Sequence, residues 1–267
     1  MKKLMRKSAI FLLVAIMLMS SVTLSFANTN QLGLFNRTLA MNIGLSISNE
    51  TLNKDGSKSF TTYNEAADVT SYFTQTNQNN GDIIYKIVEG EKQDEVTIKQ
   101  DGSLYLDGVP VTFTKVSNGE TKTDMLDINQ PNIIVPNAQQ VHSSTNPPSG
   151  TTSQQFSDYR GLNSTVVSFG DKLITQLTIG ALGIIIGAYG GMGVTIGVMV
   201  AGAIYASMVA MNPTANALSI KDYTYWHYNG FNCSPGTSAE KHFMYYYAYQ
   251  NFTGLIDDSI YYRIWTY

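Results

Sequence analysis

The sequence contains a single cysteine, Cys233, among its 267 residues. One cysteine cannot form an intramolecular disulfide, so a chain exported to an oxidising compartment must be stabilised by packing or by assembly. Charged side chains are also scarce, at 14% of the residues, and lysines and arginines cluster only at the N-terminus. Because no basic face is expected elsewhere, the composition argues against a nucleic-acid partner.

Common catalytic motifs are missing as well, since the sequence holds neither G-x-S-x-G nor H-E-x-x-H. The best catalytic candidate is Cys233 in GFNCSPGTS, which is similar to the nucleophile turn of secreted cell-wall cysteine peptidases. Asn232 and Pro235 depart from that turn, and His242 follows too soon to match the downstream histidine of that family. A structural zinc site needs four ligands, but only His227, Cys233 and His242 are available here, and their spacing fits no common zinc finger. We expect no enzyme activity, no cofactor and no metal site.

The N-terminus has the pattern of a secretory signal peptide. Basic residues precede a short apolar run over residues 9–19, and Ser25-Phe26-Ala27 places small residues at the cleavage position. The run is short for a transmembrane anchor. We expect the leader to occupy residues 1–27 and a secreted, extracellular protein to begin at Asn28.

Residues 28–117 are expected to form a small β-rich domain. Apolar and polar residues alternate with period two after Ile83, and Asn-Gly or Asp-Gly pairs separate the runs. Such pairs tolerate the positive φ of tight hairpin turns, which predicts a meander of three or four antiparallel strands. The preceding segment YNEAADVTSYFTQ predicts a short helix. The acidic pair Asp94-Glu95 is interpreted as turn chemistry rather than a calcium site, because the twelve-residue loop pattern is missing.

Residues 118–160 are expected to form a linker. Four of the seven prolines fall here, and VHSSTNPPSGTTSQQ has almost no apolar side chain. Such a segment cannot bury enough surface to offset its ordering entropy. We expect it to be disordered and open to proteolysis.

Residues 161–267 form the third region of the chain, and it contains a glycine-rich apolar run. The stretch from Leu177 to Met211 holds eight glycines and no charged side chain. As one helix it would be about 52 Å long, well beyond a ~30 Å hydrocarbon core, and AYGGMG interrupts it. The pattern predicts a helical hairpin over residues 171–211, with arms at Asp171–Ala188 and Met192–Met211.

Glycines inside helices cost about 1 kcal/mol each relative to alanine, so their spacing needs a reason. Small residues that repeat every four positions let helices approach closely, in lipid or in a tight hairpin of a protein core. We assign helix packing and membrane insertion to Gly180, Gly183, Gly187, Gly191, Gly193, Gly197 and Ala201.

An aromatic segment over residues 220–267 contains both tryptophans and more than half of the 17 tyrosines. YTYWHY and SIYYRIWTY alternate as strands do, whereas HFMYYYAYQ fits either a strand or a short helix. We expect an antiparallel sheet packed with the hairpin. Tyrosine and tryptophan favour the lipid headgroup layer, although an ordinary sheet face explains them equally well. The candidate interfacial aromatics are Tyr223, Tyr225, Trp226, Tyr261 and Trp265.

Three roles are open for the hairpin: a permanent membrane anchor, a structural core, or an element that leaves a folded protein and enters another cell's bilayer. Glycine and threonine lower the hydrophobicity of both arms, so each arm is a weak signal for stopping in the membrane during export. This favours the third role. The runner-up is a non-catalytic extracellular or cell-surface module in which the hairpin is a core or an anchor.

The signal peptide, the segment IKQDGSLYLDGVPV, the uncharged hairpin and the end YYRIWTY together resemble the large secreted bacteriocin-like proteins of Gram-positive bacteria, of the geobacillin type. The resemblance implies killing or inhibition of related bacteria. We therefore expect an α+β fold and a membrane-active antibacterial protein. Its partners would be a target-cell membrane, an immunity protein and further copies of the chain in the membrane.

Overall fold

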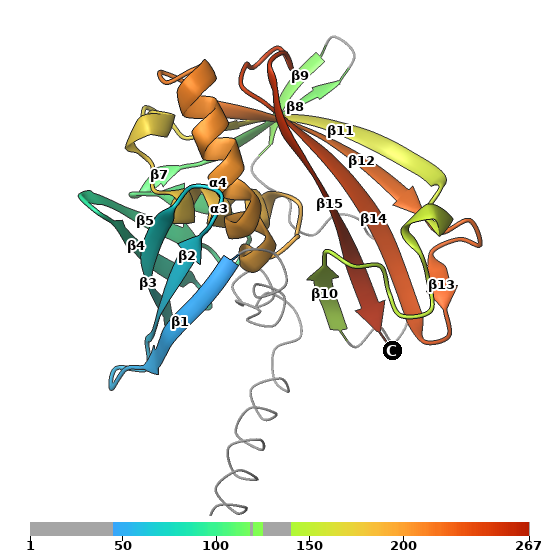
Figure 1. The fold of residues 1–267 in the computed structure, drawn as a ribbon, viewed down its shortest axis with the longest axis horizontal. Helices are drawn as coiled ribbons and strands as arrows, with labels where there is room; N and C mark the ends of the chain where they lie inside the picture. Colours follow the sequence, from blue (N-terminus) through green and yellow to red (C-terminus); the bar gives the residue numbers. More distant parts are fainter. Residues whose placement is uncertain (1–44, 118–119, 125–139, 267) are drawn as a thin grey trace, which may run out of the picture.

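The computed structural model describes residues 45–117, 120–124 and 140–266 (Figure 1). The fold is α+β, as expected, and consists of two antiparallel sheets with a helical hairpin between them. The expected signal peptide and the start at Asn28 lie outside the described residues.

The first sheet has seven strands that pair in chain order, so it is larger than the expected meander. Its tight turns include Gly102 and Gly108, whose φ values of 85° and 79° are the positive ones that the Asp-Gly pairs predicted. The strands are β1 (Leu45–Leu52), β2 (Lys58–Asn64), β3 (Val69–Asn77), β4 (Ile83–Glu89), β5 (Lys92–Ile98), β6 (Leu104–Leu106) and β7 (Val109–Pro110).

The short helix expected over residues 63–75 is wrong. This segment ends β2, turns at Asp68 with a φ of 52°, and forms β3. Phe60 and Phe73 pair across the two strands, and their rings stack with centroids 4.8 Å apart. Packing between neighbouring strands therefore outweighs the local helical spacing.

The second sheet has eight strands, in the order β10-β15-β14-β12-β11-β8-β9 with β13 attached to β14. The segment HFMYYYAYQ lies mainly in β14, which settles its ambiguity in favour of a strand. The strands are β8 (Thr112–Ser117), β9 (Glu120–Asp124), β10 (Gln140–Ser144), β11 (Asp158–Ser168), β12 (Ala217–Trp226), β13 (Asn232–Ser234), β14 (Thr237–Tyr247) and β15 (Leu255–Thr266).

Parts of the expected linker, residues 118–160, belong to this second sheet. β9 pairs with β8, β10 pairs with β15, and β11 begins at Asp158; residues 125–139 lie outside the described part. A boundary at residue 117 does not separate two sheets either, because Thr165 of β11 pairs with Lys115 of β8. Strand pairing across the chain overrides the polar composition from which the linker was predicted.

The glycine-rich run forms α3 (Ile179–Tyr189) and α4 (Val194–Met211), two helices that pack against each other between the sheets (Figure 1). The first helix starts later than expected, after a 3-10 turn at Ile174–Gln176. Thr178 caps it, since its Oγ1 accepts a 3.1 Å hydrogen bond from the N–H of Ala181.

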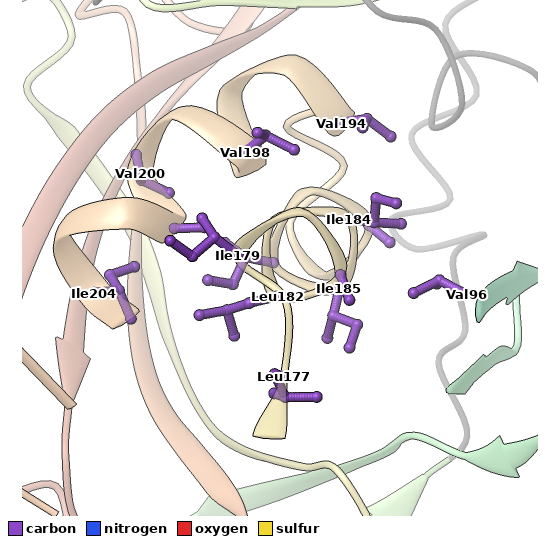
Figure 2. Packing of buried hydrophobic residues seen from close by; sticks show 14 of the residues in the cluster. Val96, Leu177, Ile179, Leu182, Ile184, Ile185, Val194, Val198, Val200 and Ile204 are labelled. Atoms are coloured by element: carbon purple, nitrogen blue, oxygen red, sulfur yellow. The ribbon is translucent and has the colours of Figure 1, made fainter. Parts of the chain in front are cut away.

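The hairpin is the centre of one continuous apolar core. Buried residues of the first sheet, of both helices and of the second sheet belong to the same cluster. Ile184 and Ile185 of α3 are fully buried, and Figure 2 shows them beside Val96 of β5. The hairpin therefore packs against both sheets rather than against the aromatic sheet alone.

Candidate functional site

The two helices touch where they lack side chains. A Cβ added at Gly183 would lie 2.4 Å from the Cα of Val198, and one at Gly187 would lie 2.5 Å from the carbonyl oxygen of Gly193. At Gly197 the added Cβ would be 2.1 Å from the carbonyl oxygen of Gly183. These three glycines therefore have the close-packing geometry that their spacing predicted.

Other small residues of the helices face the first sheet instead. A Cβ at Gly180 would lie 2.6 Å from the ring of Phe73, so this predicted helix-packing glycine lies against β3. Gly202, which sequence reasoning missed, would place a Cβ 2.2 Å from Oδ1 of Asn64. The Nδ2 of Asn64 donates a 3.0 Å hydrogen bond to the carbonyl of Val198, which fixes α4 on β2.

Gly191 and Gly193 were also predicted to pack the helices together, but they belong to the turn between the helices, with φ values of 63° and 82°. Two hydroxyl groups of the second sheet hold this turn. Tyr261 donates to the carbonyl of Gly190 and Ser143 donates to the carbonyl of Gly191, both at 2.7 Å. The turn is thus anchored to β15 and β10.

Two buried carboxylates cap the start of α3. Glu89, at the end of β4, accepts hydrogen bonds from the N–H groups of Ile179 and Gly180 at 2.7 and 2.8 Å. Asp94 of β5 accepts one from the N–H of Thr178 at 2.6 Å. A helix N-terminus has unpaired N–H groups and a positive partial charge, so both anions stabilise it.

Each capping carboxylate also has a side-chain partner. The hydroxyl of Ser71 donates to Glu89 at 2.6 Å, and Lys172 forms ion pairs with Asp94 and Asp107. Asp94 is 1% exposed and Glu89 is 8% exposed. Asp94 was interpreted as a turn residue, and only its approach to Thr178 in the folded chain shows its capping role.

α4 presents a face to solvent that carries no charge. Ala201, a predicted packing residue, is fully buried on the opposite side. Surface helices usually place charged residues toward water. Within the described part of the chain, α4 is long and apolar enough to cross a membrane, a test that buried core helices also pass. Its exposed or partly exposed small and apolar positions include Ala203, Ala206, Ser207, Ala210 and Met211.

The predicted interfacial aromatics lie on both faces of the second sheet. Tyr223 and Tyr225 of β12 are half-buried and alternate with Leu218 and Ile220, which pack into the core under the hairpin. They therefore lie on the face turned away from the hairpin. Trp226 is on the opposite face and donates from Nε1 to a carboxylate oxygen of Glu240 at 3.1 Å.

Tyr261 and Trp265 are buried in this fold, which corrects their placement in a surface belt. Tyr261 is 0% exposed, and its ring stacks on His242 with centroids 4.7 Å apart. Trp265 is 9% exposed and packs against Phe231. Alternation along β15 turns both residues to the side of the sheet that faces the hairpin.

His242 lies in a buried polar cluster. Its Nδ1 is 3.0 Å from Asp222, and its Nε2 is 3.5 Å from Glu240. Burial alone would lower the pKa of His242, but the two carboxylates raise it to about 9. The raised pKa favours the protonated ring, which lies between the carboxyl groups of Asp222 and Glu240.

The other candidates for catalysis or metal binding have packing partners. Cys233 is half-buried against a small apolar cluster that includes Phe156, and burial raises the pKa of its thiol, whereas a nucleophilic cysteine needs a lowered pKa. His227 accepts a hydrogen bond from the N–H of Asn229 at 3.2 Å within a turn. Among the described residues no group of three or more His, Cys, Asp or Glu is placed to hold a metal ion.

The distinguishing features of this fold are an uncharged hairpin, two carboxylates that cap it and an aromatic sheet that covers one side of it. The resemblance to secreted bacteriocin-like proteins stays a prediction. No protein-family model, no curated protein and no solved structure matches the chain.

Proposed function

We propose that the chain is a secreted, membrane-active antibacterial protein in which the hairpin of α3 and α4 leaves the core and enters a target-cell membrane. The observation that supports this best is the uncharged solvent face of α4. The 18 residues of this helix span about 27 Å, close to the ~30 Å hydrocarbon core of a bilayer. No charged side chain of α4 would have to be dehydrated on entry.

The anchors of the hairpin are arranged in a way that fits release. The charged members of the contacts at its start, Glu89 and Asp94, belong to the first sheet and would stay behind. At the turn, the donors Tyr261 and Ser143 belong to the second sheet. Departure of the hairpin would break these hydrogen bonds without carrying a charge into lipid.

The proposal includes partners besides the target membrane. A producer cell that exports such a protein needs an immunity protein to protect its own membrane. The small residues on the solvent face of α4 would also allow close contact between copies of the hairpin in lipid, where such residues favour helix association. The expected leader at residues 1–27 supplies the export step.

The alternative function is a non-catalytic extracellular or cell-surface module with the hairpin as its permanent core. The continuous apolar cluster favours it, because Ile185 and its neighbours on α3 are fully enclosed by both sheets. The two functions differ in one property: only the first requires the hairpin to enter lipid.

A charge on the solvent face of α4 separates the two functions. Ala206 is exposed, so Ala206→Lys should leave the folded protein intact, while a lysine within a membrane-spanning helix costs up to about 2.5–3.5 kcal/mol on insertion. We expect the wild-type protein and Ala206→Ser to release dye from vesicles of phosphatidylglycerol and phosphatidylethanolamine, and Ala206→Lys to release at least tenfold less. Wild-type protein that never releases dye, or an equally active folded Ala206→Lys variant, would overturn the proposal.

A further inference from the structure

Lys172 lies between two aspartates at the base of the hairpin. Its Nζ contacts Oδ1 of Asp94 and Oδ2 of Asp107. The three residues come from distant parts of the chain: β5, the turn between β6 and β7, and the segment that leads into α3. The side chain of Asp94 is 0% exposed and that of Lys172 is 22% exposed. The side chain of Asp107 is 41% exposed. Folding thus brings one amine together with one buried and one partly exposed carboxyl group.

Each carboxylate has one oxygen fixed by a backbone N–H and turns the other toward the amine. Oδ2 of Asp94 accepts from the N–H of Thr178 at 2.6 Å. Oδ1 of Asp107 accepts from the N–H of Glu95 at 2.8 Å. Asp107 takes a φ of 50°, as the aspartate of an Asp-Gly hairpin turn does, and its own N–H donates to the carbonyl of Glu95 at 2.8 Å. Both carboxylates are therefore held in place for contact with Lys172.

We propose that Lys172 and Asp94 form an intramolecular isopeptide bond, with Asp107 as the proton carrier. This inference concerns the folded chain and does not depend on the proposed membrane activity. It assigns a covalent cross-link to a chain that has only one cysteine and so no disulfide of its own.

The reaction starts with transfer of one proton from the Lys172 ammonium to Oδ1 of Asp94, which yields a neutral amine and a neutral acid. The amine lone pair then attacks Cγ of Asp94, and negative charge develops on Oδ2, where the N–H of Thr178 stabilises it. Asp107 takes a proton from the attacking nitrogen and passes it to Oδ1. The Cγ–Oδ1 bond breaks, one water molecule leaves, and the carbonyl reforms at Oδ2. No oxidant, reductant or other reactant is needed.

Two properties of the site favour this condensation. The side chain of Asp94 is 0% exposed, so bulk water is kept away from its carboxyl group and hydrolysis of the product is disfavoured. Holding the reacting groups in contact also replaces a collision between molecules, with effective molarities of ~10⁵–10⁸ M for well-oriented groups. Burial alone lowers the pKa of Lys172, but Asp107 and Asp94 raise it overall, which works against the initial proton transfer.

The bond would join the first sheet to the segment just before α3 and close a loop between residues 94 and 172. Thr178, which caps α3, would remain hydrogen-bonded to the new amide carbonyl at Oδ2. The start of the hairpin would then stay attached to β5 even if the rest of the hairpin moved.

Intact-mass spectrometry of the full chain tests the proposal. We expect the wild-type protein to be lighter than its sequence by one water molecule, and a digest to contain one branched peptide that joins Lys172 to Asp94. Lys172→Arg keeps the positive charge but should show no water loss. Lys99→Arg is the matched control, because Lys99, just after β5, pairs with Asp82, just before β4, at 2.9 Å, and this variant should keep the water loss.

Asp107→Asn tests the proton carrier. We expect a smaller cross-linked fraction in freshly purified Asp107→Asn protein than in wild type, with the remainder forming slowly on incubation. Wild-type protein with the full sequence mass after incubation would overturn the bond, as would a water loss that persists in Lys172→Arg. Cross-linking at the wild-type rate in Asp107→Asn would overturn the role of Asp107.

Discussion

The hydroxyl of Tyr261 donates a 2.7 Å hydrogen bond to the carbonyl oxygen of Gly190. Gly190 is the C-cap of α3, where carbonyl groups have no partner within the helix. A Cβ at this position would lie 2.4 Å from the tyrosine oxygen, so only glycine permits the contact. The C-terminal strand thus completes the hydrogen bonding of a helix end that lies far away in the sequence.

Removing this hydroxyl should weaken the fold. Tyr261→Phe leaves the partly buried carbonyl of Gly190 without its donor, which typically costs about 1–3 kcal/mol of the free energy of unfolding. Urea unfolding measures the loss. Tyr228→Phe is the control, because Tyr228 is 59% exposed and its variant should stay within about 0.5 kcal/mol of wild type. Equal stability of the two variants would contradict the importance of the contact.

The close approach of the helices leads to a second prediction. Gly197→Ala places a methyl group 2.1 Å from the carbonyl oxygen of Gly183, and overpacking of this kind typically costs ~1–3 kcal/mol. A Cβ at Gly161 of β11 meets nothing within 4 Å, so Gly161→Ala should leave the unfolding midpoint unchanged or slightly higher. If Gly197→Ala unfolds at the wild-type urea concentration, the helices are not packed as closely as described.

Local signals in the sequence were the informative ones. The Asp-Gly pair at residues 107–108 specifies a tight turn by its own chemistry, and AYGGMG ends a helix by itself, so both could be predicted. The capping role of Asp94 could not, because it depends on Thr178, which is distant in the sequence. An acidic pair beside a turn gives no sign of such a partner.

The sequence likewise does not show which face of a strand is buried. Alternation along β15 places Ile260 and Tyr261 on opposite sides of the sheet, but it does not say which side is covered. The structure buries Tyr261 under the hairpin and leaves Ile260 38% exposed. The pairing of β8 with β11 likewise depends on contacts between distant segments. Composition alone therefore could not show that the second sheet begins before residue 117.

The buried side chain of His242 predicts a pH dependence of stability. Burial alone would lower its pKa, but Asp222 and Glu240 raise it to about 9, above the ordinary value of 6.5. A raised pKa means that the folded chain holds this proton more tightly than the unfolded chain. The resulting stabilisation is fully present below pH 6.5 and is lost as the pH rises through about 9.

The rise in the pKa of His242 corresponds to ~3 kcal/mol of the free energy of unfolding. We expect the free energy of unfolding, measured in urea at several pH values, to fall across this window in the wild-type protein. In His242→Gln the decline should be much smaller, because the titrating group is gone. A wild-type protein whose stability is constant between pH 6.5 and 9 would argue against a protonated His242.

Cys233 should be dispensable. Its Sγ lies 3.6 Å from the carbonyl oxygen of Thr237, and burial raises the pKa of the thiol, so it is a packed side chain rather than an activated one. Cys233→Ser should change the free energy of unfolding by no more than about 0.5 kcal/mol and leave antibacterial activity intact. A loss of several orders of magnitude in a cell-wall hydrolysis assay, with the fold preserved, would favour a cysteine peptidase instead.

The carboxylate of Glu89 connects the stability of the fold to the proposed function. It accepts the N–H groups of Ile179 and Gly180 at 2.7 and 2.8 Å. Glu89→Gln keeps the shape of the side chain but removes its charge and turns an amide NH₂ toward a backbone donor. Hydrogen bonds to charged groups are about twice as strong as neutral ones, so the loss should be about 1–3 kcal/mol of unfolding free energy.

Under the proposed function, Glu89→Gln should also release dye from vesicles faster than wild type, because the hairpin starts from a weaker attachment. Glu91→Gln is the control: Glu91 is exposed in the adjacent turn, and its variant should change neither property. A Glu89→Gln protein that is less stable but no more active would mean that the hairpin does not leave the core. The charge at residue 89 would then serve only to cap α3, and the non-catalytic extracellular module would be the better description of the chain.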